Sequence, residues 1–177
     1  MFSDFLTLKN EKKEISLLIT LVSFFPVFIL LGSAFINLFI ILISLIFLYY
    51  SFKEKNFLFL KNYYFILLIA FFFTLLLNIF LSKFGTEDYS RQIGFIRFII
   101  FIFAINFCFN FSQGRYQNFI FKIWFYIFII VTFDLCFEFI FGFNILGNKS
   151  YMPGRLSSFL GDELKIGNYF FEFFLIS

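Results

Sequence analysis

Five apolar stretches, each about as long as a membrane-spanning helix, constrain this chain more than any other feature. A helix needs roughly 20 mostly apolar residues to cross a hydrocarbon core of about 30 Å. The stretches of this length cover residues 15–32, 34–52, 63–82, 92–111 and 118–142. Hydrophobic residues make up 62% of the chain and charged residues 14%, which excludes an ordinary soluble domain. We therefore predict an all-α, polytopic transmembrane helical bundle with five full spans.

A sixth apolar segment, residues 166–177, is too short to complete a crossing. At a helical rise of about 1.5 Å per residue it reaches roughly 18 Å. No flanking charge follows it to mark the end of a span. We expect residues 1–177 to form a single membrane-embedded helical domain that is the N-terminal part of a longer protein. A re-entrant last helix is the alternative.

Lysine and arginine are unevenly shared between the two ends of the predicted spans. With the N-terminus in the cytoplasm, the cytoplasmic side carries Lys9, Lys12, Lys13, Lys53, Lys55, Lys61, Arg115 and Lys122. The opposite side then carries Lys83, Arg91, Lys149, Arg155 and Lys165. Cytoplasmic loops are the ones enriched in these residues, so the bias predicts a cytoplasmic N-terminus. The loop at residues 143–165 then faces away from the cytoplasm.

Three ionisable residues lie deep within the predicted spans, where each charge is costly. Arg97 belongs to the fourth span, and Asp134 and Glu138 share one face of the fifth. An antiparallel neighbour would bring Arg97 to the depth of the two carboxylates. One interpretation is a structural ion pair between packed helices. The other is a polar cavity open to the outer side, where Arg97 and Arg91 hold an anionic group, although Arg91 could simply extend to the interface.

The outer loop at residues 143–165 holds the densest group of polar side chains. Arg155 offers a planar fork of donors suited to phosphate or pyrophosphate. The other polar candidates there are Ser157, Ser158, Asp162 and Glu163. Asp162 could cap the helix that returns into the membrane, with Glu163 favourable in its first turn. The loop is either an ordinary solvated connection with a helix cap or a binding site for an anion.

Several classes of site have no support in the sequence. The chain has no histidine, and its two cysteines, Cys108 and Cys136, lie within predicted spans without zinc-ligand spacing. No glycine-rich phosphate loop is present. We therefore expect no metal and no cofactor. The net charge of +3 is modest and spread over several loops, so no nucleic-acid partner is expected.

Three segments of the chain are similar to one known family in residue type and spacing. They read YSRQIGFIRF at residues 89–98, DLCFEFIFGFNILG at 134–147 and RLSSFLGDELKIG at 155–167. Together they resemble the O-antigen ligase/polymerase family over residues 89–169. Residues 1–88 agree with that family only in hydropathy.

This resemblance implies a multi-pass glycosyltransferase of the bacterial inner membrane that uses undecaprenyl-diphosphate-linked sugars, without a metal or a nucleotide sugar. By position, Arg91, Arg97 and Arg155 carry over as contacts to the diphosphate or substrate. Asp162 or Glu163 could orient an acceptor hydroxyl, while the catalytic residues stay unknown. In the family a large periplasmic loop completes the site. That loop would lie beyond residue 177, so this fragment is expected to be inactive.

The first functional hypothesis is an O-antigen-type polymerase that joins lipid-linked repeat units on the periplasmic face. The nearest alternative is the ligase that moves the finished chain to lipid A core. Two other classes are a non-enzymatic transporter of lipid-linked sugars and a structural membrane subunit. A transporter would favour repeated halves or broken helices, which the sequence does not display. The expected partners are the lipid-linked glycan, the bilayer and other membrane proteins of polysaccharide assembly.

Overall fold

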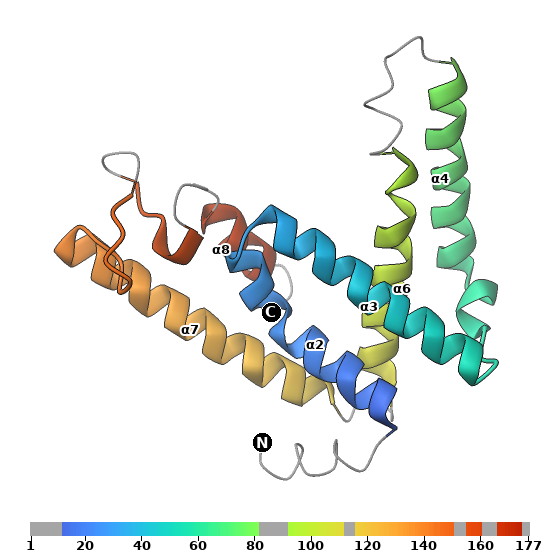
Figure 1. Ribbon diagram of the computed structural model, residues 1–177, viewed down its shortest axis with the longest axis horizontal. Helices are drawn as coiled ribbons and strands as arrows, with labels where there is room; N and C mark the ends of the chain where they lie inside the picture. Colours follow the sequence, from blue (N-terminus) through green and yellow to red (C-terminus); the bar gives the residue numbers. More distant parts are fainter. Residues whose placement is uncertain (1–11, 82–91, 112–115, 151–154, 161–165, 175–177) are drawn as a thin grey trace. The chain divides into compact units, whose positions relative to one another are not determined.

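The computed structural model describes residues 12–81, 92–111, 116–150, 155–160 and 166–174 of the 177-residue chain. Within these ranges every regular element is a helix, which confirms the predicted all-α class. The elements are α2 (Lys13–Leu30), α3 (Ser33–Lys53), the short 3-10 helix η1 (Leu58–Lys61), α4 (Tyr63–Leu81), α6 (Ile96–Asn110), α7 (Gln117–Phe141), the 3-10 turn η3 (Ser158–Leu160) and α8 (Ile166–Phe174) (Figure 1).

Among the described residues, three helices are long and apolar enough to cross a membrane. They are α2, α3 and α7, with mean hydropathies of 1.9, 2.3 and 2.1. Two shorter apolar helical stretches are Tyr63–Asn78 within α4 and Ile96–Asn110. Large apolar side chains remain exposed on these helices, for example Leu38 at 63% and Phe139 at 77%. Lipid is the solvent that suits such a surface, and these helices mark a membrane protein. The five full spans and the orientation stay predictions.

The described chain divides into two compact units, and α2 and α3 contribute to both. The first unit covers Met1–Val22 and Ile40–Gln117. Its core is built from helix faces that repeat every three or four residues. These core positions are Ile15, Leu18, Ile19 and Val22 of α2, Ile40, Ile43 and Phe47 of α3, and Ile99, Phe103 and Ala104 of α6. Helix α4 contacts η1 and α6, where the Phe65 and Phe103 rings meet edge to face at 5.2 Å.

Two ion pairs join the N-terminal end of α2 to the C-terminal end of α3 within this first unit. Lys12 Nζ lies 2.7 Å from Glu54 Oε1, and Lys53 Nζ lies 2.5 Å from Glu14 Oε1. They show that the two helices run antiparallel there. Exposed pairs of this kind contribute little to stability, so the apolar helix faces carry most of the packing energy.

The second unit covers Ser23–Phe39 and Asn118–Ser177. It includes the turn between α2 and α3, where Gly32 has a φ of +102° that a glycine adopts without strain. Helix α7 buries one face through Ile120, Trp124, Val131, Asp134 and Glu138. Helix α8 lies against α7, with the Phe170 and Phe128 rings 4.9 Å apart. The last two buried residues of α7, Asp134 and Glu138, are carboxylates, whereas its other buried residues are apolar.

Candidate functional site

The two carboxylates of α7 are buried near the C-terminal end of that helix. Asp134 is 0% exposed and Glu138 is 3% exposed. Because they are four residues apart, both point to the same face of the helix. Helix α7 ends at Phe141, and the next residue, Gly142, has a φ of +76° and an N–H bond to the Glu138 carbonyl (2.8 Å) that are typical of a helix-terminating glycine. The chain then turns back over this buried face.

Glu138 accepts hydrogen bonds from both serines of that returning loop. The Ser157 N–H lies 3.2 and 3.0 Å from Oε1 and Oε2, and the Ser158 N–H lies 2.6 Å from Oε2. The Ser157 hydroxyl also donates to Oε1 at 3.2 Å. Ser158 has a φ of +50°, a left-handed conformation that is strained in a residue other than glycine. Successive N–H groups aimed at one carboxylate can hold the backbone in that conformation.

Asp134 ties together two segments of the same loop that are distant in sequence. Its Oδ1 accepts the Ile145 N–H at 2.8 Å, and its Oδ2 accepts the Ser158 hydroxyl at 2.5 Å. Within the described residues, N–H and O–H groups therefore hydrogen-bond all the oxygens of both carboxylates. This satisfies the requirement that buried polar groups find partners.

Asn144 completes the arrangement, and the sequence reasoning assigned it no role. It is 1% exposed, and its Nδ2 donates to the Ser158 carbonyl at 2.8 Å while its Oδ1 accepts the Asn148 N–H at 2.8 Å. Gly147, with a φ of +83°, closes the turn by donating to the Asn144 carbonyl. An asparagine three residues before a glycine is a signal of such a turn. We refer to Asp134, Glu138, Asn144, Ser157 and Ser158 as the loop clamp.

Arg155 lies two residues before the clamped serines, and its side chain is exposed. Within the described residues its guanidinium makes no hydrogen bond or ion pair. Its backbone, by contrast, leads into Ser157, whose N–H is hydrogen-bonded to Glu138. The N–H groups of Ser157 and Ser158 are already used by Glu138. The arrangement thus places an exposed guanidinium two residues from an anchored backbone, which suits the binding of an anion such as phosphate.

The remaining predicted site residues fall elsewhere. Arg91, Asp162 and Glu163 lie outside the described residues. Arg97 is half-buried in α6 of the first unit, where its backbone carbonyl accepts the Ser44 hydroxyl at 3.2 Å and its guanidinium lies 5.1 Å from the Phe98 ring centre. The carboxylates belong to the second unit, so the expected pairing of Arg97 with Asp134 and Glu138 stays a prediction. In the part of the chain that is described, no group of three or more Asp, Glu, Cys or His could hold a metal ion.

Comparison of the chain with protein-family models, with curated proteins and with solved structures finds no match.

Proposed function

We propose that this chain is part of an O-antigen-type polymerase, with five spans, a cytoplasmic N-terminus and the loop clamp on the periplasmic side of the bacterial inner membrane. In this proposal Arg155 binds the diphosphate of an undecaprenyl-diphosphate-linked glycan. The observation that carries the proposal is an exposed guanidinium on a loop that buried carboxylates fix in place. The similarity of residues 89–169 to the O-antigen ligase/polymerase family supplies the identity of the substrate.

The chemistry asks for stabilisation of a leaving group. A sugar is transferred when an acceptor hydroxyl oxygen attacks the anomeric carbon and the bond to the diphosphate breaks. Negative charge then develops on the departing diphosphate. A guanidinium fork matches two phosphate oxygens at once. Donors that are already in place before the reaction are worth the most, and each one typically changes the rate by about 10²–10³-fold.

The loop clamp supports this role indirectly. Asp134 and Glu138 are proposed as positioning residues, because they contact the backbone and hydroxyls of Ser157 and Ser158 and not the substrate. If the loop were flexible, part of the substrate-binding free energy would be spent on ordering Arg155 whenever a substrate bound. Arg91 and Arg97 are proposed as further contacts to the diphosphate or substrate, and Asp162 or Glu163 as groups that orient the acceptor.

The proposal is tested in cells that carry the full-length protein with Arg155→Ala. We expect lipopolysaccharide with a single repeat unit, seen as loss of the ladder of long chains on a gel. Arg155→Lys keeps the charge without the fork, so shorter ladders are expected. Lys149→Ala is the matched control, because Lys149 is an exposed cation of the same loop. Normal long chains in Arg155→Ala cells would refute the proposal. Long chains that accumulate on the lipid carrier, without transfer to lipid A core, would instead identify a ligase.

A further inference from the structure

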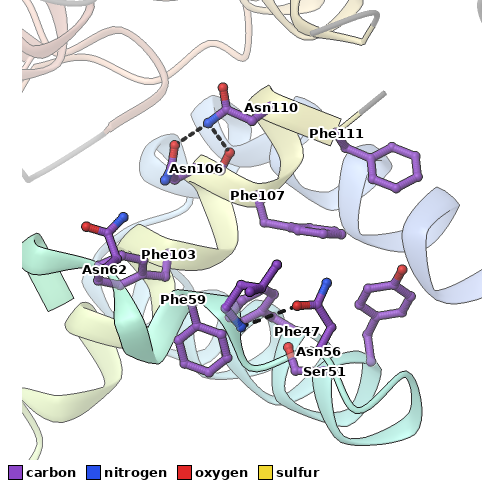
Figure 2. Close-up of a pocket in the computed structure, with 12 residues that line it drawn as sticks. Phe47, Ser51, Asn56, Phe59, Asn62, Phe103, Asn106, Phe107, Asn110 and Phe111 are labelled. Atoms are coloured by element: carbon purple, nitrogen blue, oxygen red, sulfur yellow. Dashed lines mark hydrogen bonds between the residues drawn. The ribbon is translucent and has the colours of Figure 1, made fainter. Parts of the chain in front are cut away.

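The first unit contains a cavity of about 470 Å³ (Figure 2). It lies among the C-terminal part of α3, the segment around η1 and the C-terminal part of α6. Cavities of about 300–1,000 Å³ are typical of sites for small molecules. Its lining residues include neither Arg155 nor the carboxylates of α7.

The apolar wall of the cavity is a connected set of aromatic rings. Phe107 lies at its centre, 5.7 Å from Phe47, 5.3 Å from Tyr50 and 5.5 Å from Phe111, measured between ring centres. Phe47 in turn lies 5.2 Å from Phe59. Tilted rings at these distances pack favourably. The wall is therefore held by its own contacts before any ligand arrives.

Four asparagine side chains supply the polar groups. Asn56 Oδ1 accepts the Leu58 N–H at 3.3 Å, and Asn62 Oδ1 accepts the Tyr64 N–H at 2.9 Å. These bonds fix which end of each amide is nitrogen. Asn110 Nδ2 donates to the side chain of Asn106 at 2.5 Å and to its carbonyl at 2.9 Å. In Figure 2 this Asn106–Asn110 pair and Asn56 lie on opposite sides of the Phe107 ring.

The amide atoms that make no hydrogen bond to the described residues include both donors and an acceptor. Toward the described residues, Nδ2 of Asn56, Asn62 and Asn106 donates no hydrogen bond, and Oδ1 of Asn110 accepts none. An amide offers both donors and acceptors, and a hydroxyl group does the same. No charged side chain of the described residues lines the cavity, although Lys55 and Lys61 directly precede the lining residues Asn56 and Asn62. A phosphate is bound best by charged donors, which this lining lacks.

We propose that this cavity binds an uncharged, hydroxyl-rich group such as a sugar. The apolar face of the group packs on Phe107 and its neighbours, and its hydroxyls exchange hydrogen bonds with the asparagine amides. The group is either the headgroup of a neutral glycolipid or a free sugar, because both present the same chemistry to the cavity.

The test measures lipid binding to the full-length protein by native mass spectrometry. The probes are glucosyl diacylglycerol, phosphatidylglycerol and diacylglycerol with identical acyl chains. The informative variant is Asn106→Ala/Asn110→Ala, because both positions are exposed on α6 and alanine favours a helix, so folding is preserved. Asn78→Ala is the matched control, an exposed helical asparagine of the same unit outside the cavity. Methyl glucoside is added as a soluble competitor.

We expect the wild-type protein and Asn78→Ala to prefer glucosyl diacylglycerol over both other lipids. Loss of two amides should weaken that binding by about fivefold or more, because two hydrogen bonds of at least about 0.5 kcal/mol each are lost and each 1.4 kcal/mol is about tenfold. Competition by methyl glucoside would show that a free sugar is accepted, and its failure would assign the site to the glycolipid. Equal binding of phosphatidylglycerol, or unchanged glycolipid binding by the double variant, would overturn the proposal.

Discussion

Removing the Glu138 carboxylate should release the loop that it holds. In Glu138→Ala the N–H groups of Ser157 and Ser158 lose their acceptor, and both residues are 0% exposed. A buried donor left without a partner costs about 1–3 kcal/mol, so two such donors cost about 2–6 kcal/mol. The strained φ of +50° at Ser158 also loses the bond that opposes it. Together these losses favour an open loop.

The assay is hydrogen–deuterium exchange of the full chain in lipid nanodiscs, followed in peptides that contain residues 155–160. The lower bound of about 2 kcal/mol corresponds to roughly 30-fold faster exchange at Ser157 and Ser158, because each 1.4 kcal/mol is about tenfold. Peptides from α3 should not change. Glu54→Ala is the matched control, since it removes an exposed acid whose partner is the surface cation Lys12.

Exchange at Ser157 and Ser158 that stays within about threefold of wild type would refute the reasoning. It would mean that the loop keeps its conformation without Glu138, through its own turn or through other contacts. The role of the carboxylates as positioning residues for Arg155 would then fall as well, whatever the activity of Arg155 variants.

Three further predictions use the same helices and loop. In Asp134→Asn the peptides that contain residues 155–160 should exchange hydrogen for deuterium almost as slowly as in wild type, because the amide oxygen can accept the Ile145 N–H and the amide nitrogen can donate to the Ser158 hydroxyl. In Asp134→Ala both bonds are lost, and exchange in the same peptides should be faster. Ser158→Gly should be less disruptive in thermal unfolding than Ser158→Ala, because both lose the hydroxyl but only glycine relieves the strain at φ +50°. The hydrogen bond to Glu54 raises the pKa of Lys12 above 10.5. The stability that this pair adds to the fold is therefore present below pH 10.5 and is lost as the pH rises through the higher folded-state pKa. NMR titration should show Lys12 losing its proton at higher pH in wild type than in Glu54→Gln.

The helices of this protein were largely readable from hydropathy, because a long apolar run in lipid has few alternatives to a helix. Each predicted apolar range contains a helix, and α7 ends one residue earlier than expected because Gly142 adopts a left-handed conformation. Helix α6 begins at Ile96, four residues inside the expected range of 92–111. A turn at Gly94, closed by the Phe95 N–H bond to Gln92, separates it from the residues before. Glycine is a poor helix former, which explains the break.

The candidate site was less readable, because its bonds join positions far apart in sequence. Asp134 and Glu138 stood out as buried charges, but the sequence offered Arg97 as their partner on the basis of depth alone. Within the described residues the structure supplies neutral donors from Ser157, Ser158 and Ile145, and the pairing with Arg97 stays a prediction. Loop segments lack the periodicity that reveals a helix face, so nothing in the local pattern placed those serines over α7. The sequence named the two serines as polar candidates of an anion site, and the structure uses both as donors to the carboxylates of α7.

The clamp's reliance on neutral donors bears directly on Arg155. A buried acid satisfied by an arginine would consume that arginine's charge and its donor geometry. Here each carboxylate oxygen is satisfied by N–H and O–H groups, so neither acid draws the guanidinium of Arg155 inward. The cation is left exposed, and the backbone beside it is anchored. Replacing the acids with leucine and methionine would keep α7 apolar at no cost in buried charge. The same replacement would remove the hydrogen-bond acceptors of Ser157 and Ser158 and so release the loop. A role in positioning the loop therefore accounts for two buried carboxylates better than a role in stability alone.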